Sequence, residues 1–237
     1  MVRNRFFLIM STLFLGLVLV GFSRSFYLKS YFDFPALPIH LQIHGVALSS
    51  WFLLACLQPW LVSAGNVRLH RKLGAAGVGI ATSVVATGIW TLVLRDAPNI
   101  TEHPSAAAGN IASLFMFLYC VCFGVVYRRN SGTHKRLMLL ASVPILAPAL
   151  DRFARIAWMN DFLGSLLYWF PAPPEVAFAT IAFLFLLAVV VAHDVISERR
   201  LHKGTLIGIL SILVLAPATT YLIVASGAWV GFVRWLT

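Results

Sequence analysis

Seven long apolar stretches follow one another along this 237-residue chain and leave little sequence for anything else. Each is close to the roughly 20 residues that an α-helix needs to cross the hydrocarbon core of a bilayer. Because lipid cannot hydrogen-bond the backbone, such stretches must be helical. The sequence therefore predicts an all-α, polytopic membrane bundle of seven transmembrane helices. The predicted spans are Phe6–Gly21, Pro38–Val62, Leu73–Leu94, Ala106–Tyr127, Leu137–Trp158, Glu175–Val195 and Thr205–Trp235.

Composition indicates the same class of protein. Hydrophobic residues make up 60% of the chain and charged residues only 11%, whereas a soluble domain carries about a quarter charged residues. No polar segment is long enough to fold separately, so residues 1–237 are predicted to form one transmembrane domain. The net charge of +10 is spread over short loops. This distribution indicates the lipid bilayer as partner and argues against nucleic acid.

The Lys and Arg residues predict the orientation of the bundle. One side carries 12 of the 18 cations and two of the eight acids, and this side is predicted to be cytoplasmic. The N-terminus then lies inside and the C-terminus outside. The 12 cations are Arg3, Arg5, Arg68, Arg71, Lys72, Arg128, Arg129, Lys135, Arg136, Arg199, Arg200 and Lys203.

A weak internal repeat suggests which helices form the core. His70 and His134 each precede basic residues at the cytoplasmic start of a helix. Two helix pairs of the same orientation would form a parallel repeat. Helices two to five, residues 38–158, are therefore predicted to form a four-helix core, flanked by residues 1–37 and 159–237. His193, Asp194 and His202 are interpreted as ordinary loop residues, which can contact anionic headgroups.

Polar residues within the spans predict a cluster in the outer half of the bilayer. His40 and His44 lie four apart on the second helix and share a face, as do Asp151 and Arg155 on the fifth. At a rise of about 1.5 Å per residue, His44 and Asp151 lie at similar depth. Trp51 and Gln58 extend the histidine face into a seam that must contact protein. The predicted cluster comprises His40, His44, Asn110, Asp151, Arg152 and Arg155.

Two interpretations of this cluster remain open. Ionisable residues within a span are rare and usually mark a functional site. An Asp–Arg pair near a helix end can also be a simple ion pair, and a histidine there can bond a neighbouring carbonyl.

Several short motifs carry a resemblance to known proteins. His40-x3-His44, Trp51 and Gln58, His70-Arg-Lys-Leu-Gly and His134-Lys-Arg-Leu-Met resemble a set of uncharacterised bacterial multi-pass membrane proteins. More distantly, residues 38–158 resemble the cytochrome b561-like di-haem membrane proteins. In those proteins, two histidines on different helices clamp each haem iron. The resemblance implies a bacterial inner-membrane location and His70 and His134 as haem ligands. The outer half departs from it, since no second histidine faces His40 and His44.

Three functions follow as alternatives. The first is a redox protein that holds haem b or a quinone, because neutral imidazoles bind haem iron and hydrogen-bond quinone carbonyls. The second is a non-catalytic accessory or assembly subunit that binds other membrane subunits. The third is a zinc-dependent hydrolase acting on lipid, with His40, His44 and Asp151 as metal ligands. Whether the protein is an enzyme is left open by the sequence.

Overall fold

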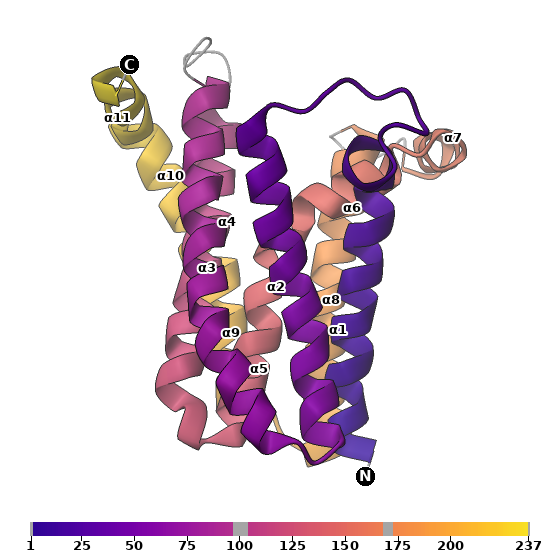
Figure 1. The fold of residues 1–237 in the computed structure, drawn as a ribbon, viewed down its shortest axis with the longest axis vertical. Coiled ribbons are helices and arrows are strands. Elements are labelled where there is room, and N and C mark those ends of the chain that lie inside the picture. The colour runs from indigo at the N-terminus through magenta and orange to yellow at the C-terminus, as the bar shows by residue number, and fades with distance from the viewer. Residues whose placement is uncertain (1, 97–103, 168–172, 237) are drawn as a thin grey trace.

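The computed structural model describes residues 2–96, 104–167 and 173–236, and within these ranges it contains helices and no strands (Figure 1). Six helical segments of the described chain are long and apolar enough to cross a membrane. The protein is therefore an all-helical bundle suited to a lipid bilayer. The six segments are Ile39–Ser63, Val67–Arg95, Ala107–Arg129, Ser131–Ala154, Pro174–Glu198 and Lys203–Ser226.

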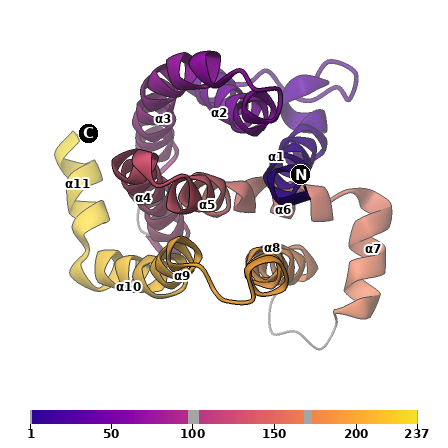
Figure 2. The same cartoon turned by 90° about the horizontal axis from the view of Figure 1, so that it is seen from below.

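The α-helices are α1 (Val2–Gly21), α2 (Ile39–Ser63), α3 (Val67–Asp96), α4 (Pro104–Val126), α5 (Ser131–Ser142), α6 (Ala147–Ala154), α7 (Ala157–Leu166), α8 (Pro174–Glu198), α9 (Lys203–Leu210), α10 (Ala216–Ser226) and α11 (Ala228–Leu236). Short 3-10 or π segments are η1 (Ser23–Tyr27), η3 (Tyr127–Arg129), η4 (Pro144–Leu146) and η5 (Ser211–Leu215). The turns at 64–66, 127–130 and 199–202 lie at the same end of the bundle as the N-terminus (Figures 1 and 2), and we call this the basic end.

The first predicted span, Phe6–Gly21, corresponds to α1, whose apolar part, Arg5–Gly21, is shorter than the six segments above. One face of α1 is buried in the main core through Phe7, Met10, Phe14 and Val18. The helix is thus an integral part of the bundle, and the count of seven membrane spans stays a prediction. The parallel repeat within residues 38–158 stays one as well.

Helices α5 and α6 form the centre of the bundle (Figure 2). Seen from the basic end, they lie between α2 and α3 on one side and α8, α9 and α10 on the other. The segment Ser131–Ala154 is accordingly the most buried of the six apolar segments, with 67% of its most apolar window inside the protein. A polar residue on this segment must therefore find its partner within the protein.

Proline and glycine interrupt the helices, as their backbone chemistry requires. Two of the spans contain a break in α-helical geometry near a proline: a 3-10 turn at Pro144–Leu146 and a π turn, Ser211–Leu215, just before Pro217. Proline has no N–H and clashes with the preceding turn, which explains both breaks. The seventh helix was predicted to continue to Trp235, but Gly227 adopts a left-handed conformation with φ of 63° and ends α10 there.

The polar seam predicted on α2 faces protein along its length. Trp51 is 2% exposed, donates from Nε1 to Ser142 Oγ at 3.1 Å, and packs edge to face on Phe117. One turn from the end of α2, the Gln58 amide contacts His70 on α3. These contacts fix how α2 is rotated and show that the seam serves helix packing as well as any site.

The close contact between α1 and α6 predicts a sharp difference between two glycines on α1. A Cβ at Gly21 would collide with the backbone carbonyl of Ala149, whereas a Cβ at Gly16 would meet nothing within 4 Å. Replacing Gly21 with alanine should destabilise the protein by about 1–3 kcal/mol, because backbone cannot move aside cheaply. Replacing Gly16 with alanine should be neutral or stabilise by up to about 1 kcal/mol through helix propensity. Unfolding by SDS in mixed micelles measures both, and equal effects would contradict the packing.

Candidate functional site

His70 and His134 come together at the basic end of the bundle. His70 lies near the start of α3 and His134 near the start of α5. Their imidazole rings are nearly perpendicular, with centres 6.3 Å apart. Both side chains are partly buried. The structure thus brings together the two residues that the sequence predicted as cofactor ligands.

Each of the two imidazoles is held through its Nδ1 atom. His134 Nδ1 lies 2.7 Å from the carbonyl oxygen of Gly124 on α4, and since a carbonyl only accepts, this nitrogen donates. His70 Nδ1 accepts from the side-chain amide of Gln58, whose oxygen accepts from the Gly74 N–H at 3.0 Å. Within the described chain, no hydrogen bond to Nε2 of either ring is formed. The pair therefore presents two ring nitrogens to a shared ligand.

The hydrogen bonds also set the tautomers of the two neutral rings. His134 keeps a lone pair on Nε2, whereas His70 carries its proton on Nε2. Binding of one metal ion by both nitrogens would require the His70 proton to move to Nδ1. A half-turn of the Gln58 amide would then present an oxygen to that proton, which is how outer partners orient metal-binding histidines.

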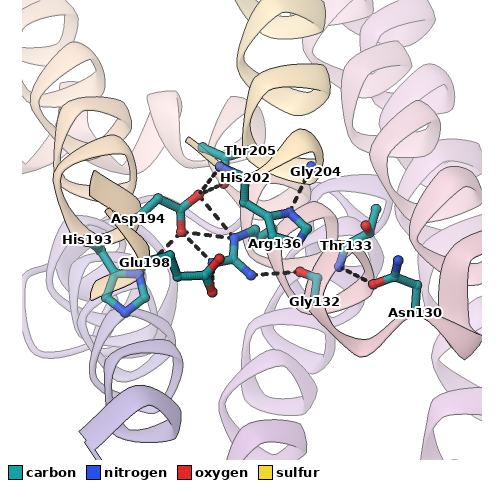
Figure 3. A network of polar contacts seen from close by, with 10 residues as sticks. All are labelled: Asn130, Gly132, Thr133, Arg136, His193, Asp194, Glu198, His202, Gly204 and Thr205. Carbon is teal, nitrogen blue, oxygen red and sulfur yellow. Dashed lines mark hydrogen bonds and ion pairs between the residues drawn. The ribbon is translucent and has the colours of Figure 1, made fainter. Parts of the chain in front are cut away.

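A second polar site, which the sequence analysis did not single out, lies at the same end of the bundle (Figure 3). Arg136 on α5 and Asp194 on α8 are both fully buried. Arg136 Nε donates to the two carboxylate oxygens of Asp194 at 2.9 and 3.1 Å, and Nη2 forms an ion pair with Oδ1 at 2.5 Å. The same Nη2 atom donates to Glu198 Oε1 at 2.8 Å. One guanidinium thus neutralises two acids.

Asp194 also joins α8 to α9. Its Oδ2 atom accepts from the hydroxyl of Thr205 at 2.5 Å and from the backbone N–H of His202 at 3.2 Å. On the other side, Arg136 Nη1 donates to the carbonyl of Gly132 at 2.9 Å. The network therefore ties three helices, α5, α8 and α9, and satisfies the charged groups at its centre.

Two glycines allow α9 to approach α5 so closely. A Cβ at Gly204 would lie 2.9 Å from Thr133 Cα, and one at Gly132 would lie 2.8 Å from His202 Nε2. His202 caps α9 by accepting from the Gly204 N–H at 3.0 Å. Burial, followed by the charge of Arg136, lowers the pKa of His202 below its usual value.

His193 on α8 connects α1 to the ion network. Its ring stacks on Phe6 at 3.7 Å between centres, and its Nδ1 atom lies 3.5 Å from Asp194 Oδ1. The interpretation of His193, Asp194 and His202 as ordinary loop residues was therefore wrong, because all three pack within the protein. One signal could have revealed the network: Asp194 falls near the end of an apolar span, where an acid requires a partner.

The predicted outer residues find separate partners. His44 Nδ1 lies 2.9 Å from Thr87 Oγ1 on α3, and Thr87 donates its own proton to the Ser83 carbonyl at 2.6 Å. Thr87 must therefore accept from His44, which leaves the lone pair of His44 on Nε2. His40, one turn away, lies beside the ring of Trp90, with ring centres 5.9 Å apart. Both histidines thus face α3.

The acidic part of the predicted cluster faces α8 instead. Asp151 accepts from Arg155 at 3.1 and 3.2 Å, and Arg155 also forms an ion pair with Glu175 on α8 at 3.3 Å. Arg152 donates to a carbonyl of its own helix and lies over the ring of Phe22. Asn110 on α4, the remaining member of the predicted cluster, is not without a partner either.

The structure therefore joins Asp151 to Arg155 but forms no direct bond between either histidine and Asp151. Among the residues that the structure describes, no three or more His, Cys, Asp or Glu side chains lie together in a way that could hold a metal ion. The predicted zinc ligands His40, His44 and Asp151 are thus not assembled as one group here.

Known proteins do not identify the chain. No protein-family model, curated protein or solved structure matches it. The resemblance to cytochrome b561-like proteins consequently rests on the short motifs alone.

The two sites at the basic end differ in what they can do chemically. In the ion network the central charges are already paired, which favours a structural role. The His70–His134 pair has unused ring nitrogens on two different helices, and these can bind a metal ion or a hydrogen-bonding ligand. The histidine pair is therefore the candidate functional site.

Proposed function

We propose that this integral membrane protein binds haem b, which His70 on α3 and His134 on α5 would hold, and that it carries electrons. The observation that supports the proposal is the convergence of these two imidazoles, with ring centres 6.3 Å apart, from helices far apart in sequence. Haem b supplies one-electron redox chemistry when its iron is held by protein ligands.

The distance between the rings fits such a ligand pair. A bond from imidazole nitrogen to a transition metal is about 2 Å long, so two nitrogens on opposite sides of one ion lie about 4 Å apart. The centres of two such rings lie somewhat further apart than their binding nitrogens. The observed distance of 6.3 Å between the ring centres of His70 and His134 agrees with this spacing. Both donors are imidazoles held at Nδ1, and His70 would bind the iron through Nε2 once its proton has moved to Nδ1.

The residues of this chain would orient the ligands. The Gly124 carbonyl holds His134 in the tautomer that leaves Nε2 free, and Gln58 fixes the plane of the His70 ring. Such partners set ring orientation and raise ligand basicity. A quinone is the alternative ligand, since His70 Nε2–H can donate to a quinone carbonyl.

We also propose that α1 is a seventh span in a bacterial inner membrane, with the N-terminus and the basic end in the cytoplasm. The charge asymmetry supports this orientation. Reporter fusions at the two termini should then be active on opposite sides of the membrane. Termini on the same side would rule out seven spans.

The absorption spectrum of protein purified from haem-replete cells tests the proposed function. We expect a Soret band that sharpens and shifts on reduction, and extraction of non-covalent haem b at about one per chain. Metal analysis of the same sample should find iron and no stoichiometric zinc. A colourless, folded protein would contradict the proposal and would favour the accessory-subunit alternative.

A further inference from the structure

Five exposed cations lie on the segments next to the histidine pair. They come from two segments: the first two turns of α3 and the short η3 helix. All five are exposed, and we call them the basic collar. The collar consists of Arg68, Arg71, Lys72, Arg128 and Arg129.

Backbone geometry places these segments beside the pair. Arg68, Arg71 and Lys72 flank His70 in sequence on α3. The bond from His134 to the Gly124 carbonyl fixes the end of α4 next to that ring, and η3 follows directly. The N-termini of α3 and α5 lie here too, and helix N-termini carry partial positive charge. The region next to the histidine pair is therefore strongly positive.

The acids at the basic end do not neutralise the collar. Asp194 and Glu198 are both bound by Arg136, inside or near the protein core. In the described part of the chain, no ion pair joins any collar residue to an acid. An excess of cations is expected on the cytoplasmic side of a membrane protein. That general excess does not explain why the two acids at this end are bound by Arg136 and not by the collar.

We infer that the basic collar is a docking surface for the acidic face of a soluble one-electron donor protein. The inference rests on the proposed function. A bound haem b would receive its electron from another molecule, and the exposed cations of the collar favour a donor whose contact surface is acidic. The donor would lose one electron and the ferric iron would gain it, with no proton or bond change. Complementary charge accelerates such encounters and makes them depend on salt.

The experiment uses the full-length protein in nanodiscs of phosphatidylcholine, which adds no net charge. Reduced flavodoxin, an acidic soluble one-electron donor, is mixed with the ferric protein, and haem reduction is followed by stopped flow. We expect the bimolecular rate constant to fall about tenfold or more between low salt and about 0.5 M salt. Arg71→Gln/Lys72→Gln should lower the low-salt rate several-fold without changing the spectrum.

A matched double variant separates local from overall charge. Arg199→Gln/Arg200→Gln removes two exposed cations from the same end, beside the ion network rather than the histidine pair. This variant should change the rate far less. A rate independent of salt, or equal losses in the two double variants, would overturn the inference while leaving a haem protein intact. Loss of the salt dependence in discs containing phosphatidylglycerol would assign the collar to lipid headgroups and would also overturn it. A protein without haem would refute the proposed function itself, and the inference with it.

Discussion

Replacing Asp194 with alanine is expected to lower the free energy of unfolding by about 3–5 kcal/mol, because it leaves a buried guanidinium without its main partner. Arg136 and Asp194 are both fully buried. The substitution also removes the acceptor for the Thr205 hydroxyl and the His202 N–H. Reversible unfolding by SDS in mixed micelles measures the loss. A large fall in the yield of monodisperse protein would accompany it.

An exposed ion pair provides the control. Asp151 and Arg155 are 31% and 56% exposed, and Arg155 keeps Glu175 as a partner when Asp151 is removed. Asp151→Ala should therefore cost at most about 1 kcal/mol.

The double variant Arg136→Met/Asp194→Leu distinguishes a charge effect from a packing effect. Its loss should be clearly smaller than the sum of the two single losses, because no unpaired charge remains buried. Glu198 still loses its bond to Arg136, and Thr205 its bond to Asp194, so recovery should be partial. Additive losses, or an Asp194→Ala loss no larger than that of Asp151→Ala, would show that the network does not stabilise the fold.

The second large effect is expected at the histidine pair. His134→Ala should abolish the Soret band of the purified protein, because one of two axial ligands is lost and the ring oriented by Gly124 disappears with it. His70→Ala should have the same effect. Added imidazole should restore part of the band in either variant, since it can replace the missing ligand. Thermal unfolding of the variants shows whether the fold persists.

His40→Ala is the matched control for this experiment. His40 is also a partly buried histidine, but it lies near the start of α2, away from the basic end, beside Trp90. Its removal should leave the Soret band of the protein unchanged. If His40→Ala or His44→Ala removes the band while His70→Ala and His134→Ala retain it, the haem lies in the outer half and our ligand assignment is wrong.

Position along the chain was enough to predict that the protein is helical and roughly where its spans lie. It was also enough to predict that His70 and His134 lie at one level. Apolar length determines that a segment is a membrane helix, because the bilayer forces its backbone to hydrogen-bond internally. The two histidines each stand at the basic start of a core helix, and helix starts on one side of a membrane share one depth. Depth follows from position along the chain, so the sequence could place them at one level.

Position along the chain does not give the rotation of each helix about its axis. That rotation determines which neighbouring helix each side chain contacts. His44 and Asp151 have similar depths, yet His44 bonds Thr87 on α3 whereas Asp151 and Arg155 face α8. Equal depth does not determine which neighbour a side chain meets. That depends on which helices pack together, and here α5 and α6 separate the α2–α3 side from the α8–α10 side.

The sequence by itself determined that this protein is a helical membrane bundle with a basic end and two histidines at one level there. Only the tertiary structure decided that Arg136 meets Asp194, Glu198 and, through Asp194, Thr205. The physical reason is that the spacing of apolar residues specifies how far a residue lies along a helix. Its partners depend on long-range packing, which close contacts such as Gly204 against Thr133 permit and which no local pattern encodes.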